Sequence, residues 1–266
     1  MSPDRPESMP HNKDEIVFEQ PLTERVRLYL RLEFLFAQYR HGQADPSVWG
    51  VRSALGTLLD ILSLVSRSDL KSEIIKELTN QHGVLTRLRE RPGVDPERLG
   101  VVLGHITRAL NAMQQLTTQA TATGLRENEF LMTLANRSTV PGGTSNFDLP
   151  HFHCWLSQPD DVHRRDLGAW FADLLPFETA IVLYLNLLRE STERTSQIAA
   201  GGVFIHTPQA TFQLVRVIVP TVLSLYPEIS AGRHRFTVRF MMQRDINTHA
   251  KQAASDIPFQ LQLCLL

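Results

Sequence analysis

Arginines that could bind an acidic partner occur in two separate parts of this sequence. Arg27 and Arg31 lie four residues apart in a helical pattern, so they fall about one turn apart on the same side of a helix. Arg235 and Arg239 lie in a segment that alternates polar and apolar residues, so both point to one side of a predicted strand. A guanidinium group can bind a carboxylate through two parallel hydrogen bonds. The two pairs therefore predict carboxylate binding, with ordinary solvated arginines as the alternative.

Three more arginines, Arg216, Arg233 and Arg244, extend the second set, and acidic residues near it are sparse. A basic sheet face of this kind could also contact the phosphates of nucleic acid. The formal net charge of the chain is −1, however, and the basic residues are not interleaved with aromatic ones as in RNA-binding sheets. A nucleic-acid-binding module therefore stays an alternative interpretation of this face.

His151, His153 and Cys154 form the densest group of possible metal ligands or nucleophiles. If this segment is a strand, the two histidines point to one side and could both bind zinc, but the segment could also open a helix. A closed zinc site needs four ligands, and no second Cys/His pair supplies the others. No motif marks an oxyanion hole for a Cys154 nucleophile. We expect no catalytic residue, no metal and no cofactor, and keep a Cys/His or zinc hydrolase as an alternative. His153 is either a polar member of a binding pocket or a structural histidine.

The bulk composition is typical of a globular protein that can bury a sizeable core. The chain has 266 residues, of which 42% are hydrophobic, and two cysteines that lie far apart. Two cysteines make a poor disulfide framework and suit a reducing compartment. Residues 1–15 are polar, carry three prolines and read as a disordered lead-in rather than a signal peptide. No apolar run approaches the length of a membrane span. We expect a soluble cytoplasmic protein.

Helical periodicity dominates the first half of the chain. After Pro21, Thr23 is expected to cap a helix that turns Leu22, Val26, Tyr29, Leu30 and Phe34 toward a core. Further helices are predicted at residues 48–65, 68–91, 95–113, 127–137 and 165–189, the last with a possible kink at Pro176. The Thr- and Ala-rich stretch 117–124 is expected to be a joint between segments.

Alternating patterns dominate the end of the chain. Strands are predicted at residues 201–206, 211–219, 226–230, 234–242 and 257–265, most plausibly in one antiparallel sheet with a polar and an apolar face. Residues 17–19 could return to join this sheet. Helices first and strands last predict an α+β fold, with an N-terminal helical domain and a C-terminal antiparallel β-domain. The expected divisions are a lead-in at 1–15, a mainly helical domain at 16–138, and a β-domain at 139–266 that includes one long helix at about 165–190.

Five stretches occur in the order found in one protein family. They are FEQPLTERVRLYLRLEF at 18–34, PGG at 141–143, FDLP at 147–150, HCW at 153–155, and LYPEIS at 225–230 followed by RFTVRFM at 235–241. In these stretches the chain resembles the ZapD family of bacterial cell division proteins. The resemblance implies a symmetric homodimer without enzymatic activity. It also implies binding to the C-terminal tail of FtsZ, the tubulin-like division GTPase, and bundling of FtsZ filaments during Z-ring assembly at the division septum.

The resemblance also implies a basic binding surface. By motif position it assigns this surface to Arg27, Arg31, His153, Arg235 and Arg239. One departure is Glu129, which stands where the family can show a further arginine; Arg126 or Arg137 could replace the missing charge. The dimer face is not given by any motif. The helix at 48–65 is a candidate, because it has more apolar residues than one buried stripe needs.

Overall fold

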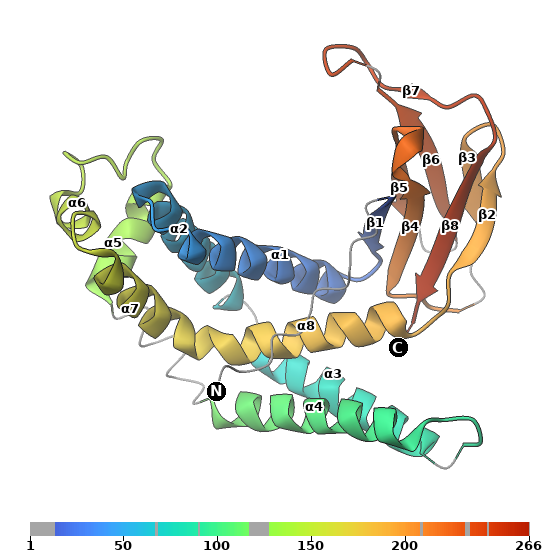
Figure 1. Cartoon of the computed structure of the whole chain (residues 1–266), viewed down its shortest axis with the longest axis horizontal. Helices are drawn as coiled ribbons and strands as arrows, with labels where there is room; N and C mark the ends of the chain where they lie inside the picture. The colour runs from blue at the N-terminus through green and yellow to red at the C-terminus, as the bar shows by residue number, and fades with distance from the viewer. Residues whose placement is uncertain are drawn as a thin grey trace. The chain divides into compact units, whose positions relative to one another are not determined.

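The structure is a computed structural model that describes residues 14–66, 69–89, 91–116, 128–207, 210–231, 235–243 and 245–265 (Figure 1). The helices are α1 (Glu24–Ala44), α2 (Val48–Val65), α3 (Leu70–Leu88), α4 (Pro96–Gln115), α5 (Glu129–Ser138), α6 (Pro150–Leu156), α7 (Asp160–Phe171) and α8 (Leu175–Glu190), with short 3-10 turns η2 (Ala172–Leu174) and η3 (Thr221–Leu223). The strands are β1 (Glu15–Pro21), β2 (Thr195–Ala199), β3 (Val203–His206), β4 (Leu214–Pro220), β5 (Leu225–Ala231), β6 (Phe236–Met242), β7 (Lys251–Gln252) and β8 (Ile257–Cys264). The predicted joint at 117–124, most of the lead-in, and Arg126, Arg233 and Arg244 lie outside the described residues.

Helices precede antiparallel strands, so the α+β class is confirmed. By internal contacts the chain forms two compact units. The helical unit is Leu28–Leu185, and the β unit combines Met1–Arg27 with Asn186–Leu266. Helices α5 to α7 and most of α8 thus group with the earlier helices. The boundary at residues 138 and 139 expected from the sequence stays a prediction.

The core of the helical unit is built on aromatic residues of α1. Tyr29 meets Tyr184 of α8 edge to face with ring centroids 5.3 Å apart, and Tyr39 stacks on Phe171 of α7 at 4.2 Å. The Tyr39 hydroxyl donates a hydrogen bond to the Leu167 carbonyl at 2.8 Å. Each buried hydroxyl needs such a partner, so this contact fixes α7 against α1.

The face of α1 that is buried differs from the one predicted. Phe34 was expected to face the core, but it is 67% exposed. The buried stripe instead continues through Leu32 and Phe36 to Tyr39. Both stripes have helical spacing, and α1 is apolar over more than one face, so periodicity alone did not choose between them.

The remaining predicted helices are present. The N-cap predicted at Asp95 is confirmed, since its carboxylate accepts hydrogen bonds from the backbone N–H groups of Glu97 and Arg98. Helices α3 and α4 pack side by side as a hairpin (Figure 1). The helix predicted at 165–189 is interrupted by η2, which begins at Ala172. Pro176 lies four residues later, and a proline ring clashes with the carbonyl four residues before it.

Two segments of the chain meet the length and hydropathy of a membrane span. They are Val48–Val65 and Asp160–Glu190. The sequence reading, which expected no apolar run of that length, was wrong on this point. The finding is weak evidence for a membrane protein, because α2 places seven residues in the interior of the unit, as a core helix of a soluble protein also does.

The β unit contains two antiparallel sheets rather than the single sheet predicted. Sheet A has the strand order β1-β4-β8-β2, and sheet B has the order β3-β6-β5, with β7 paired to β6. The predicted return of residues 17–19 is confirmed, because β1 pairs with β4 in antiparallel register from Glu15↔Pro220 to Pro21↔Leu214. Gly201 and Gly202, with φ of 54° and 77°, turn the chain between β2 and β3.

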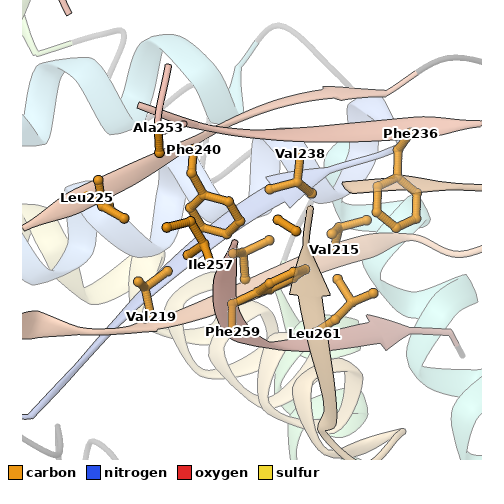
Figure 2. Close-up of a cluster of buried hydrophobic side chains, with 12 residues drawn as sticks. Val215, Val219, Leu225, Phe236, Val238, Phe240, Ala253, Ile257, Phe259 and Leu261 are labelled. Carbon is orange, nitrogen blue, oxygen red and sulfur yellow. The ribbon is translucent and has the colours of Figure 1, made fainter. Parts of the chain in front are cut away.

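Side chains from both sheets form one core between them (Figure 2). Phe236, Val238 and Phe240 of β6 point toward Phe259 and Leu261 of β8. Valines of β4 complete the cluster (Figure 2). Because successive strand residues point to opposite sides, this core fixes which residues of each strand face outward.

Candidate protein-binding surface

The first predicted arginine pair lies on the exposed side of α1. The Thr23 hydroxyl accepts a hydrogen bond from the Val26 N–H at 3.2 Å, so the predicted cap is confirmed. Arg27 is partly exposed and lies 3.3 Å from the Glu24 carboxylate, one turn earlier. Arg31 is exposed and forms no ion pair with another described residue. Of the two, Arg31 is the more available to a partner.

The second pair lies at β6 of sheet B, where Arg239 is on the side away from the core and Arg235 directly precedes the strand. Arg235 and Arg239 are exposed, and alternate with the buried Phe236, Val238 and Phe240. The predicted parity of the two arginines is therefore confirmed. Arg239 stands directly opposite Val203 of β3 and Glu228 of β5. Within the described residues neither arginine forms an ion pair.

The same outward side carries apolar residues that sequence reasoning did not single out. Ile205 is opposite Thr237 and is 60% exposed, and the half-buried Tyr226 is opposite Met241. We call this side of sheet B the open face. It consists of Val203, Ile205, Tyr226, Glu228, Ser230, Thr237, Arg239 and Met241, and we include Arg235, which directly precedes β6; none of these residues is buried. The sequence does not reveal the pairing register of the strands, and this register decides which residues of β3 and β5 lie beside Arg239.

Arg216, which the sequence placed with the basic set, has a different role. It lies on sheet A opposite Glu19 of β1 and Gln262 of β8. Its Nε is 2.9 Å from the Glu19 carboxylate, and its Nη1 donates to the Gln262 side-chain oxygen at 2.7 Å. Arg189 of α8 binds the same carboxylate through two hydrogen bonds of 2.9 Å. Arg216 is therefore engaged within the fold.

We call the outer side of sheet A the covered face. It carries an interacting group of three charged residues and one amide, namely Glu19, Arg189, Arg216 and Gln262. The Gln262 amide donates to the backbone carbonyls of Arg189 and Thr192, so the end of α8 is fastened to the sheet. Burial alone raises the pKa of Glu19, but the hydrogen bonds and charges of Arg189 and Arg216 outweigh it and hold that pKa below its usual value. Glu19 is thus an ionised, paired carboxylate.

His153 lies on α6, so the strand interpretation of residues 151–155 is wrong. Pro150 occupies the first turn, where its missing N–H costs nothing. Residues two apart on a helix point to nearly opposite sides. His151 and His153 therefore do not point to one side, as they would on a strand. Among the described residues no group of three or more His, Cys, Asp or Glu could hold a metal ion. His151, His153 and Cys154 are all exposed.

The structure does not bring His153 close to Arg31. Phe152, next to His153, is buried under Arg52 of α2, whose guanidinium carbon is 4.8 Å from the Phe152 ring centroid. Figure 1 accordingly shows α6 at the end of the helical unit where α1 finishes and α2 begins. Arg31 precedes the end of α1 at Ala44 by about 20 Å of helix. The two residues therefore mark different parts of the helical unit.

Glu129, the departure from the family pattern, is the first residue of α5. Asn128 caps this helix by accepting a hydrogen bond from the Leu131 N–H at 3.1 Å. Glu129 is exposed there, and a carboxylate is favourable at the positive end of a helix dipole. Its presence thus has a local structural reason. Arg137 is exposed in the last turn of the same helix.

The helical unit also exposes large apolar side chains that sequence reasoning missed. Trp49 is 77% exposed and Val48 is 48% exposed, both in the first turn of α2. Phe147, of the FDLP motif, is 85% exposed. The Arg52 guanidinium is 5.7 Å from the Trp49 ring and donates to the Thr144 carbonyl at 3.3 Å. The start of α2 and the loop before α6 thus form a second region with exposed aromatic residues.

Each unit of this α+β protein thus exposes arginines and large apolar side chains, and no metal cluster occurs among the described residues. A family model described as "ZapD: Cell division protein" matches residues 30–239. The cell division protein ZapD of Methylococcus capsulatus is 40% identical over 258 residues, which covers 96% of this chain and the whole of that relative. The chain belongs to the ZapD family of cell division proteins.

Proposed function

We propose that this protein is a non-enzymatic cell division factor that binds the C-terminal tail of FtsZ and cross-links FtsZ filaments during Z-ring assembly. Membership of the ZapD family supports a role in cell division. The observation that carries the proposal is the state of Arg31, Arg235 and Arg239. Each is exposed and forms no ion pair with a described residue, whereas Arg189 and Arg216 are paired within the fold. Unpaired arginines are available to the carboxylates of an acidic partner.

The proposed mechanism combines weak individual sites with repetition. A short peptide that pairs with a few exposed arginines should bind with a Kd on the order of micromolar. A homodimer offers two such sites, and a filament presents many tails, so effective concentration converts weak binding into stable cross-links. His153 and Arg27 are proposed as further contacts, with His153 serving a different part of the partner, because it lies far from Arg31 along the helical unit.

The proposed homodimer is supported by the exposed apolar residues of α2. Val48 and Trp49 lie uncovered at its start, and an exposed tryptophan is a common anchor of protein interfaces. Trp49→Ser is expected to weaken self-association by more than tenfold in sedimentation equilibrium. The matched control is Val101→Ser, since Val101 of α4 is 58% exposed. Equal self-association of the two variants would remove the start of α2 from the dimer interface.

The proposed location is the cytoplasm, with recruitment to the division septum by FtsZ. We expect no cofactor and neither nucleic acid nor membrane as a partner. The nucleic-acid alternative is tested by a gel shift with duplex and single-stranded DNA. The zinc or Cys/His hydrolase alternative is tested by metal analysis of the purified protein and by hydrolase assays of Cys154→Ala.

The direct test is binding to the isolated FtsZ tail peptide, with and without its acidic residues. Arg31→Glu should abolish cosedimentation with FtsZ polymers while leaving the circular dichroism spectrum unchanged. Arg108→Glu is the matched control, because Arg108 is an equally solvated arginine in the middle of α4. Full bundling by a folded Arg31→Glu protein would exclude α1 from the binding surface. Failure of the wild-type protein to bind the tail would overturn the proposed function itself.

A further inference from the structure

The open face of sheet B carries more than its two arginines, and the strand register orders it into rows. Residues directly opposite one another on neighbouring strands share a face and lie about 5 Å apart. One row is Ile205, Thr237 and Ser230, and the next is Val203, Arg239 and Glu228. A third row contains Tyr226 and Met241. The row with charged residues therefore lies between two rows without them, and each of the three rows carries at least one apolar side chain.

The spacing of these rows matches an extended peptide. Arg235, directly before β6, and Arg239 on β6 are four residues apart, which corresponds to about 13 Å if the extended backbone rise holds from Arg235 onward. The row of Ile205 falls midway between them, and the row of Tyr226 and Met241 falls two residues beyond Arg239. An extended ligand lying along β6 turns every second side chain toward the sheet with the same repeat.

One open-face residue opposes such a ligand. Glu228 is exposed and stands across from Arg239, yet the two form no ion pair. A carboxylate at this position repels an arriving carboxylate and competes for the same guanidinium. Arg239 is thus available, but the negative charge of Glu228 partly offsets its positive charge.

We propose that the open face reads an extended acidic segment in which two carboxylates at positions i and i+4 alternate with apolar side chains at i+2 and i+6. Arg235 and Arg239 bind the two carboxylates, Ile205 contacts the first apolar side chain, and Tyr226 with Met241 contacts the second. The Glu228 carboxylate repels the acidic segment and so limits the affinity of the open face for it. The inference rests on the proposed function, since the acidic segment is taken to be the FtsZ tail, and adds apolar and spacing requirements to it.

The decisive experiment compares two isoleucines. Ile205 on the open face and Ile198 on β2 of sheet A are 60% and 65% exposed, and both lie on edge strands of the β unit. By calorimetry with the FtsZ tail peptide, Ile205→Ser should weaken binding about tenfold, because an exposed isoleucine loses contact area that binding would bury. Ile198→Ser should bind like the wild-type protein. Equal affinities of the two variants, beside normal wild-type binding, would overturn the inference and leave the proposed function standing.

A second measurement tests the spacing and Glu228. A synthetic seven-residue peptide with acids at positions 1 and 5 and leucines at 3 and 7 should bind at least fivefold more tightly than a scrambled peptide of the same composition. Glu228→Gln should raise affinity for it about threefold. Equal binding of the two peptides, or saturation of this face by DNA or by a second copy of the chain, would overturn the inference. Absence of binding by the wild-type protein to every acidic peptide would instead overturn the proposed function.

Discussion

The two outer faces of the β unit carry the same residue type in opposite states. On the covered face, Arg189 and Arg216 share the Glu19 carboxylate, and their side chains are 13% and 12% exposed. On the open face, Arg235 and Arg239 are exposed and form no ion pair with a described residue. A buried, shared carboxylate makes an arginine part of the fold, whereas an unpaired exposed arginine is free to bind. The comparison therefore separates structural arginines from candidate binding arginines without reference to sequence motifs.

The largest expected effect comes from breaking the covered face. Glu19→Ala leaves two guanidinium groups largely buried without their carboxylate, which should lower the free energy of unfolding of the β unit by about 3–5 kcal/mol. Hydrogen exchange of β1 and β4 amides is the suitable measurement. Tryptophan fluorescence is not, because all three tryptophans, Trp49, Trp155 and Trp170, lie in the helical unit. Glu228→Ala on the open face is the control and should change stability by less than about 0.5 kcal/mol. A similar loss in both variants would contradict the distinction between the faces.

The next effect concerns binding rather than stability. Arg239→Glu should weaken binding of the FtsZ tail more than tenfold, because it replaces an attraction with a repulsion, and should leave thermal unfolding within a few degrees of the wild-type protein. Arg235→Glu should act in the same direction. An Arg239→Glu protein that unfolds as readily as Glu19→Ala would show that the open face is structural after all.

Acid should act on the covered face selectively. The pKa of Glu19 is lowered from its usual value of 4.5 in the folded protein, so its contribution to stability is present above about pH 4.5 and is lost as the pH falls through the folded pKa. The stability difference between the wild-type protein and Glu19→Gln should therefore shrink below about pH 4.5. The measurement is urea unfolding at several pH values between 3 and 7, with hydrogen exchange of amides in the β unit as the readout. A constant difference would mean that Glu19 is not the ionised partner of Arg189.

Salt should act mainly on the open face, with the smallest effect of the four. At about 0.5 M salt the Debye length falls to roughly 4 Å, which screens exposed charges far more than partly buried ones. Tail binding and filament bundling should therefore weaken severalfold between 0.1 and 0.5 M salt in cosedimentation. The exchange rates of the β1 amides should change little. Salt-resistant bundling would point to the apolar side chains of the open face, rather than the arginines, as the main source of affinity.

Much of the β unit was predictable because a strand's own alternation is a local property. The sequence placed Arg235 and Arg239 on one face, opposite Phe236, Val238 and Phe240, and brought residues 17–19 back to the sheet. It did not separate one sheet from two, because each strand alternates in the same way in both cases and only long-range pairing decides. The sequence also grouped Arg216 with Arg235 and Arg239, because its partner Glu19 is far away in sequence and only the strand pairing brings them together.

The helical unit was predictable in its elements and less so in its contacts. Caps at Thr23 and Asp95 gave the helix starts correctly, since capping depends on neighbouring residues. Residues 151–155 were misread as a possible strand because α6 is only seven residues long, too short for periodicity to distinguish a helix. Exposure of Trp49 and Phe147 was not predictable, since it depends on which neighbours cover them.

The strand order of sheet A also constrains how the protein can be made. Its second strand from one edge, β4, pairs with β1 on one side and with β8 on the other, and β8 ends at Cys264. During translation, Val17 and Phe18 thus leave the ribosome long before any strand exists to receive them, while the helices between can fold as they emerge. Sheet A therefore cannot close until β4 and β8 have both been synthesised, and the apolar side chains of β1 lack their sheet partners until then.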